Sequence, residues 1–376
     1  MQRDLNTIQK PRKILDEDSG ITAMAFDLSL YYFDYFNLIN VDEIILVPED
    51  KPVSAPVHSL NYIRSIYTTD TAGALFFGSE REVFGCYFQD NFTGGSLGNL
   101  LEGRVTYTGE TRNTWTYGLN LGFDDHTSTI KTTSGRDQII GSAITAGSYF
   151  TIGLALFFGS TITTGGAADT IQGTALNTGS NQSTGSGTYG ILLSEGSILD
   201  TGDGCDTVTG AASDQANSTD VAGIGSDTGD SYIRTGRGND KVIAMATGNG
   251  SREDGFNSRV DSRLFVQTGA DCDSVTGYGH AIFDGGSGVD TFDLRGYRLD
   301  EFKIYKPNRC VNHYIFDRDG IIADISNFEI FRFDGDQRIA ATLPTCNGGI
   351  PGWDSSINPV IEAMNPATDL PSNSHA

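Results

Sequence analysis

Short apolar stretches recur along residues 130–295, on either side of a glycine-rich turn that ends in an aspartate. The copies align on these aspartates, which are Asp137, Asp169, Asp206, Asp240, Asp273 and Asp290. The residue two positions after each aspartate is apolar in all six copies, and so is the residue seven positions before it. Because side chains alternate between the two faces of a strand, this pattern predicts a strand, a turn and a second strand in every copy.

Successive aspartates are separated by 32, 37, 34, 33 and 17 residues. Repeats with a period in this range form coils that stack and share one core. The sequence therefore predicts an all-β fold, a β-solenoid of the parallel β-helix or β-roll kind. Stacked strands lie ~4.8 Å apart, which would place the aspartates in a column at that pitch. Close carboxylates repel one another, so a cation between the coils is the natural remedy.

The chain is expected to divide into four segments. Residues 1–70 form an N-terminal cap segment, because an aromatic, apolar stretch at 26–40 would cover the first coil. Residues 71–295 form the solenoid repeats, and the sequence ALFFGS occurs identically at 74–79 and 155–160. Residues 296–340 form a small C-terminal β-rich module. Residues 341–376 form a flexible tail in which Gly, Pro, Ser and Asn dominate.

Composition narrows the classes of partner. The net charge of −23 argues against nucleic-acid binding, which needs a basic face. No run of 18 apolar residues is present, so no membrane span is expected, and the charged first 20 residues do not read as a Sec-type signal peptide. The cysteines are Cys86, Cys205, Cys272, Cys310 and Cys346. They lack CxxC spacing, which argues against zinc, and a pair between Cys310 and Cys346, or between Cys205 and Cys272, stays open.

The stretch GGSGVDTFDLRGY at 285–297 resembles the hemolysin-type, or RTX, calcium-binding nonapeptide GGxGxDxUx, in which U is a large apolar residue. The segment ending in ISNFEIFRFDG resembles the module that commonly follows those repeats. The resemblance implies that turn carbonyls and the aspartate bind Ca²⁺ between stacked coils. The implied ligands are Gly202, Gly204 and Asp206; Gly236, Gly238 and Asp240; Gly286, Gly288 and Asp290; and Asp271 with Asp273, where Asp271 replaces a glycine. Such hard oxygen ligands suit Ca²⁺.

This chain departs from the family pattern in spacing. The family's repeats run in tandem, whereas here most turns recur only once per 32–37 residues. The spacing predicts a wide, degenerate solenoid. The turns at Asp137 and Asp169 have each lost a glycine, and we expect them to be mainly structural.

Four alternatives stay open at this point. Gly94–Gly98 fits GxSxG, the nucleophile elbow of a serine hydrolase, some of which carry RTX repeats. A polysaccharide-acting β-helix enzyme would need carboxylates clustered with Arg or Lys, yet the basic residues of the repeats are scattered. The threonines before the aspartates could line a glycan- or ice-binding surface. The turns could also be purely structural, because Asp after Gly is good turn chemistry.

Taken together, the sequence predicts a secreted or cell-surface calcium-binding structural or adhesive repeat protein, and it favours a non-enzymatic role. Its folding is expected to be coupled to Ca²⁺. Expected partners are calcium ions and cell-surface glycans or other surface proteins. By analogy with the family, export would use an uncleaved C-terminal secretion signal.

Overall fold

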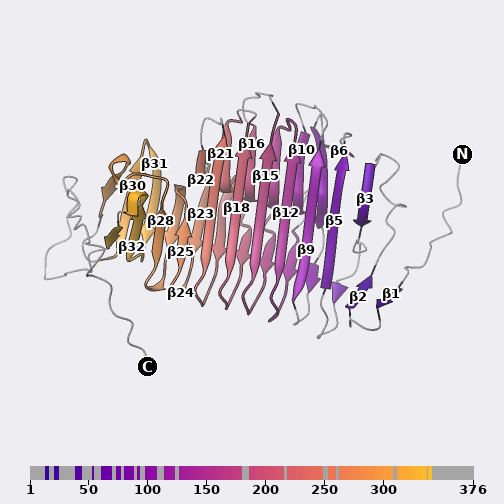
Figure 1. The fold of residues 1–376 in the computed structure, drawn as a ribbon, viewed down its shortest axis with the longest axis horizontal. Coiled ribbons are helices and arrows are strands. Elements are labelled where there is room, and N and C mark those ends of the chain that lie inside the picture. The colour runs from indigo at the N-terminus through magenta and orange to yellow at the C-terminus, as the bar shows by residue number, and fades with distance from the viewer. Residues whose placement is uncertain are drawn as a thin grey trace, which may run out of the picture.

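In the computed structural model the chain winds into a β-solenoid whose parallel strands lie side by side along its length (Figure 1). Side chains are described for residues 98–107, 114–122, 127–179, 186–215, 218–248, 255–259, 262–307 and 311–335, and other strands by their backbone alone. The described part contains no α-helix, only the short 3₁₀ turns Leu299–Glu301 and Asp334–Asp336. The predicted all-β solenoid is confirmed.

Each wide coil has three faces, numbered here in chain order from the aspartate turn. The first face is the 11-stranded sheet, in which long strands pair in parallel and in register. Its strands are β3 (Ile39–Ile44), β5 (Asn61–Thr69), β9 (Asn99–Tyr107), β12 (Gln138–Thr145), β15 (Thr170–Asn177), β18 (Thr207–Asp214), β21 (Lys241–Gly248), β25 (Ser274–Thr276), β28 (Thr291–Leu294), β32 (Ile330–Phe333) and β33 (Arg338–Ala340).

The second and third faces together form the 18-stranded sheet. Strands of the second face are β7 (Glu80–Phe88), β10 (Thr114–Leu121), β13 (Phe150–Leu156), β16 (Gly187–Leu193), β19 (Asp220–Ser226) and β22 (Glu253–Ser258), with β6 (Gly73–Phe77) antiparallel to β7. Strands of the third face are β4 (Val53–Ser54), β8 (Asn91–Thr93), β11 (Thr129–Lys131), β14 (Thr161–Thr163), β17 (Ile198–Asp200), β20 (Gly229–Arg234), β23 (Ser262–Gln267), β26 (Gly279–Asp284) and β31 (Ile321–Ser326).

The apolar columns predicted from the sequence form the core. On the third face, Ile130, Ile162, Leu199, Ile233, Val266 and Phe283 are fully buried. On the first face, Ile139, Ile171, Val208, Val242, Val275 and Phe292 are fully buried as well. Both columns belong to one continuous cluster, so every coil contributes to a shared hydrophobic core. The period-2 pattern was sufficient to identify these positions.

A line of glycines narrows the solenoid between the first and second faces. A Cβ atom on Gly173 would lie 2.1 Å from the carbonyl oxygen of Gly190, and one on Gly210 would lie 2.2 Å from that of Gly223. Only glycine allows two backbones to approach this closely. Beyond this line the interior is polar, and its buried hydroxyls pair with each other, as in Thr145–Thr151 at 2.8 Å.

The C-terminal coil is narrower. Strand β26 pairs with both β22 and β23, so one strand replaces two and the coil has 17 residues from Asp273 to Asp290. Strands β31 and β32 then continue the sheets in parallel with β26 and β28. Strands β29 (Lys303–Tyr305) and β30 (His313–Arg318) add antiparallel pairings. The segment 296–340 therefore joins the sheets of the solenoid.

At the other end, β3 pairs antiparallel with β5, and β1 (Lys13–Asp16) pairs with β2 (Ile21–Met24). The expected cap over residues 1–70 and the expected tail over 341–376 lie outside the residues whose side chains are described.

Candidate functional site

The aspartates that end the turns form one hydrogen-bonded ladder inside the solenoid. In each coil the Oδ1 atom accepts a hydrogen bond from the backbone N–H of the aspartate one coil earlier. For example, the N–H of Asp206 donates to Oδ1 of Asp240 at 2.7 Å. The same contact, at 2.8 Å, joins Asp137 to Asp169, Asp169 to Asp206, Asp240 to Asp273 and Asp273 to Asp290. The structure thus brings all the predicted aspartates of the column together.

Two residues that the sequence argument missed extend the ladder at its ends. Nδ2 of Asn99 donates to Oδ1 of Asp137 at 2.6 Å. At the other end the N–H of Asp290 donates to Oε2 of Glu329 at 2.8 Å, and Asn312 donates to Oε1 of the same carboxylate at 2.9 Å. A signal for Asn99 exists, because FTGGSLGNLL at 92–101 has the same frame as FDGGSGVDTF at 283–292. The sequence signal for Glu329 is weaker. It consists only of the apolar Phe331 two positions later, where each ladder aspartate also has an apolar residue.

The second carboxylate oxygen of most ladder aspartates has no hydrogen-bond partner. Buried, unpartnered Oδ2 atoms occur at Asp169, Asp206, Asp240, Asp273 and Asp290. These residues are at most 2 % exposed. A buried carboxylate oxygen that makes no hydrogen bond is costly, because it has lost its water. At Asp169, Asp206, Asp240 and Asp273 the threonine hydroxyl five residues earlier offsets only part of that loss. This row of oxygens is the main chemical feature of the interior.

Burial raises the pKa of these carboxyl groups. The pKa of Asp169, Asp240, Asp273 and Asp290 rises from the ordinary 3.8 to about 7. Loss of solvent is the largest cause, the backbone N–H bond and the threonine hydroxyl five residues earlier oppose it, and neighbouring carboxylates raise the pKa further. The pKa of Asp137 and Asp206 is raised too, again by burial. The column therefore favours a proton or another positive charge.

A threonine ladder runs beside the aspartates. The hydroxyl of Thr164 donates to the carbonyl oxygen of Thr201 at 3.1 Å, and that of Thr235 donates to the carbonyl of Thr268 at 2.9 Å. Thr132, Thr164, Thr201, Thr235 and Thr268 are at most 2 % exposed. The alternative in which this column forms a binding surface is therefore wrong. A strand pattern alone does not say which way the first residue of a turn points.

The glycines of the turns are required by the close stacking of successive turns. Gly202, Gly236 and Gly286 have φ of 82°, 90° and 84°, and a Cβ on any of them would lie within 2.0 Å of the carbonyl oxygen one coil earlier. Gly238 and Gly288 also have positive φ, and a Cβ on Gly204 would lie 1.9 Å from the carbonyl oxygen of Ala167. Asp271, which replaces such a glycine, is exposed and has φ of 88°. Asp273 of the ladder, by contrast, is buried.

The donor atoms of two turns are compatible with a hard cation. The carbonyls of Gly202 and Gly236 already accept N–H groups, from Arg237 at 3.2 Å and from Ala270 at 2.8 Å. Within the described residues, none of the turn hydrogen bonds uses the carbonyl of Gly204 or Gly238. No group of three or more His, Cys, Asp or Glu side chains in the described part is placed to hold a metal. A cation here would therefore use the free Oδ2 atoms together with backbone carbonyls.

The cysteines of the turns are free thiols. Cys205 and Cys272 are both exposed and unpaired, so the possible bridge between them is not formed. They occupy equivalent positions two coils apart, with Asn239 between them, whose Oδ1 accepts the N–H of Cys272 at 2.9 Å. Cys86, Cys310 and Cys346 lie outside the residues whose side chains are described.

The GxSxG match falls between β8 and β9 in the chain. A nucleophile elbow needs a helix directly after the serine, and here the strand β9 follows. Ser96 itself lies outside the described residues. The local structure thus gives no support to a serine hydrolase, and the spacing of this match is explained by its origin as a degenerate copy of the repeat.

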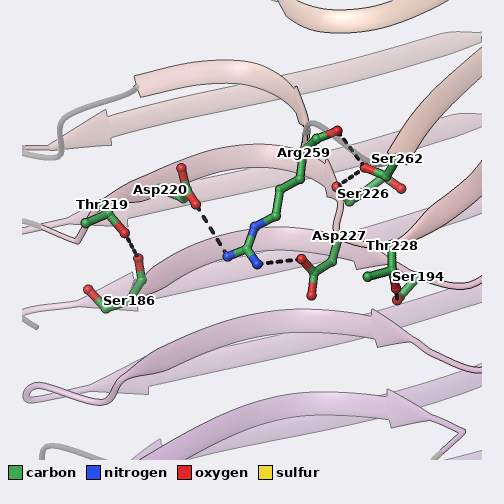
Figure 2. A network of polar contacts seen from close by, with 9 residues as sticks. All are labelled: Ser186, Ser194, Thr219, Asp220, Ser226, Asp227, Thr228, Arg259 and Ser262. Atoms are coloured by element: carbon green, nitrogen blue, oxygen red, sulfur yellow. Dashed lines mark hydrogen bonds and ion pairs between the residues drawn. The ribbon is translucent and has the colours of Figure 1, made fainter. Parts of the chain in front are cut away.

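One cluster of opposite charges spans β19, from Asp220 at its start to Asp227 just after its end (Figure 2). Arg259 reaches back one coil to Oδ1 of Asp227 at 2.6 Å and to Oδ2 of Asp220 at 3.4 Å. Tyr189 lies nearby and is 2 % exposed, and burial raises the pKa of its hydroxyl. Enzymes that act on uronic acids need a basic group that reaches the substrate. A buried tyrosine and a paired arginine tie neighbouring coils together instead.

Hydroxyl pairs beside this cluster join the corners of successive coils (Figure 2). Thr219 donates to the carbonyl oxygen of Ser186 at 2.8 Å, and Ser194 and Thr228 share a hydrogen bond of 2.6 Å.

In the described part of the chain no helix is long and apolar enough to cross a membrane. A comparison with family models, curated proteins and solved structures finds no match to this chain.

Proposed function

We propose that this protein is an extracellular structural repeat protein whose β-solenoid folds together with Ca²⁺ bound along the aspartate column. The observation that supports the proposal is the row of buried, unpartnered Oδ2 atoms from Asp169 to Asp290. These atoms face a column of like charges, and positive charge between the coils would relieve their repulsion.

The column has two ways to be neutralised. Below about pH 7 the raised pKa values allow protons to occupy it. Above that pH the carboxylates ionise inside the protein, and a cation is then the remaining source of compensation. Because the cation would bind the folded coils and not the unfolded chain, its binding free energy would add to the free energy of folding.

The turns of Asp206 and Asp240 are the strongest candidates for Ca²⁺. Each has two glycines, a free Oδ2 and a second-glycine carbonyl that accepts no turn hydrogen bond. Ca²⁺ tolerates irregular sets of six to eight oxygen ligands, whereas Mg²⁺ requires a near-ideal octahedron. Ligands on a stacked backbone cannot rearrange freely, so this site would favour the larger ion.

The cellular location follows from the same coupling. A chain with a net charge of −23 would be least stable where Ca²⁺ is scarce and would become compact where Ca²⁺ is abundant, outside the cell. An elongated solenoid held there would act as a structural or adhesive element, with cell-surface glycans or proteins as its partners.

Calorimetric titration and thermal melting at about pH 8 test the proposal. Ca²⁺ should raise the melting temperature of the wild type relative to EGTA, and Mg²⁺ should raise it less. Asp206→Asn keeps the Oδ1 acceptor but replaces the charged oxygen by an amide, as Asn99 does at the head of the ladder. It should melt above the wild type in EGTA and respond less to Ca²⁺.

Asp319→Asn is the matched control, since Asp319 is an exposed residue between β30 and β31, away from the aspartate turns, and its loss changes the net charge equally. It should leave the calcium response unchanged. The proposal fails if the wild type shows no binding heat and the same melting temperature in Ca²⁺ and EGTA at about pH 8.

A further inference from the structure

The outer surface of the first face is a broad array of small polar and aliphatic side chains. In-register pairing aligns the outward residues of neighbouring strands in rows. From β12 to β25 the outward residues are Gln138, Ile140, Ser142, Ile144, Thr170, Gln172, Thr174, Leu176, Thr207, Thr209, Ala211, Ser213, Lys241, Ile243, Met245, Thr247, Ser274 and Thr276. We call this set the neutral face. Lys241 is its only charged residue.

The neutral face differs from the third face in its outward charges. The outer side of the third face carries several charges, among them Asp200, Asp230, Arg234, Arg263 and Asp284. At both ends of the neutral face, charged residues appear again and form ion pairs. Arg104 pairs with Glu102 on β9, and Arg295 pairs with Asp293 beside β28. An uncharged centre with a charged rim is the usual composition of a protein–protein interface.

The neutral face is accessible and large enough for a specific contact. Met245 is 48 % exposed and Ile144 is 39 % exposed, so no described element covers them. Four strands of eight residues and the three-residue β25, ~4.8 Å apart with a rise of ~3.3 Å per residue, span roughly 550 Å² of projected area. A standard interface takes about 800 Å² of accessible surface from each partner, and the accessible surface of side chains exceeds their projected area.

We propose that the neutral face is the surface through which two copies of this chain associate. A second copy carries the same charge of −23, so two molecules repel each other on any charged face. The neutral face is where they can approach most closely. Parallel strands in register make it regular, and two such sheets can pack face to face at ~10 Å with small side chains between them. A twofold axis through its centre would make the contact self-complementary.

Sedimentation velocity on the full chain tests this proposal through its dependence on salt. The wild type should form dimers, and raising the salt concentration should strengthen them, because salt screens the repulsion between two like-charged molecules. Association through ion pairs would weaken with salt, and that result would overturn the proposal. So would a wild type that remains monomeric at every salt concentration.

Met245→Lys places a charge near the centre of the neutral face and should weaken dimerisation at least about tenfold. Ile322→Lys is the matched control, since Ile322 is 44 % exposed on β31 of the third face. It should leave the dimer unchanged. Thr209→Lys, on the neighbouring strand, provides a second variant if Met245→Lys proves unstable by circular dichroism. If Met245→Lys and Ile322→Lys dimerise equally well, the neutral face is not the dimer interface.

The measurements should be made both in Ca²⁺ and in EGTA. The neutral face contains none of the proposed calcium ligands, so the proposal of self-association and the proposal of calcium binding can fail separately. If the folded protein does not respond to Ca²⁺ but dimerises as described, the proposal of self-association stands and the proposal of calcium binding fails.

Discussion

The wide coils and the narrow C-terminal coil share one ladder although their lengths differ twofold. Coils between Asp137 and Asp273 use three strands and 32–37 residues, whereas the coil from Asp273 to Asp290 uses two strands and 17 residues. The ladder hydrogen bond is nevertheless 2.8 Å long in the narrow coil and 2.7–2.8 Å in the wide ones. The turn therefore sets the register between coils, and coil length does not.

What changes with coil width is how the interior is filled. In the wide coils the first and second faces approach each other at paired glycines, with aliphatic residues filling the interior on one side of this line and buried hydroxyls on the other. Toward the narrow end, Ala244 stands in the row that holds Gly173 and Gly210. Phenylalanines then fill the core, with Phe283 and Phe292 edge to face at a centroid distance of 4.9 Å. A coil with fewer strands is thus filled by larger side chains.

The largest effect should come from emptying the narrow coil. Phe292→Ala removes a fully buried ring that contacts Phe283 and Phe328, and it should lower the free energy of unfolding by about 4 kcal/mol. Ile171→Ala, at the equivalent position of a wide coil, should cost about 3 kcal/mol. Chemical denaturation would measure both. A smaller loss for Phe292→Ala than for Ile171→Ala would show that the aromatic filling is not what holds the narrow coil.

The fold was predictable because its information is local and repeated. A residue such as Val208 is apolar at a fixed distance from Asp206, and that spacing is sufficient to place it in a core. The aspartate column was also predictable, because equal positions in stacked coils must lie above one another. Both follow from the period alone.

Other features could not be predicted, since they depend on contacts between coils. The sequence does not show that Thr201 turns inward, because its direction is set by the carbonyl of Thr235 in the next coil. Nor does it show that Asp206 presents one oxygen to a backbone N–H and leaves the other without a partner. Glu329 was missed because its longer side chain reaches the ladder from outside the six-copy pattern.

A second prediction concerns the glycine line, which distinguishes the wide coils. In Gly210→Ala the new Cβ would lie 2.2 Å from the carbonyl oxygen of Gly223 and 2.5 Å from Cγ1 of Ile224, and the backbone of Gly223 would have to move to relieve the clash. The substitution should cost about 2 kcal/mol of unfolding free energy, against the small gain that alanine usually brings. Ala244→Gly, in the same row nearer the narrow coil, should cost about 1 kcal/mol or less. Equal losses would mean that the narrowing of the wide coils is not imposed by glycine.

A third prediction tests whether the ladder is chemically uniform across both regions. The pKa of Asp240 in a wide coil and of Asp290 in the narrow one is raised from 3.8 to about 7. The folded state therefore holds these protons more tightly than the unfolded state does. The contribution of these bound protons to the stability of the folded state is complete below about pH 4 and is lost as the pH rises through 7. In EGTA the melting temperature should fall over this range.

Variants at the two sites separate the regions. Asp240→Asn and Asp290→Asn each remove one titrating group, so each should flatten the pH profile by a similar amount. Asp319→Asn, at an exposed position away from the ladder, should leave the profile unchanged. A profile that flattens only for Asp240→Asn would contradict a uniform ladder.

The smallest effect is expected at the turn that leads into the narrow coil. Asp271 occupies a left-handed conformation with φ of 88°, which costs a residue with a Cβ about 1 kcal/mol. Its charge also raises the pKa of Asp273, after burial and Asp290. Asp271→Gly should therefore raise the free energy of unfolding by about 1 kcal/mol in EGTA, although glycine gains freedom in the unfolded chain. Asp271→Asn removes the charge and keeps the Cβ, so it isolates the electrostatic part. If both variants stabilise the protein equally, repulsion within the column, and not backbone strain, limits this turn.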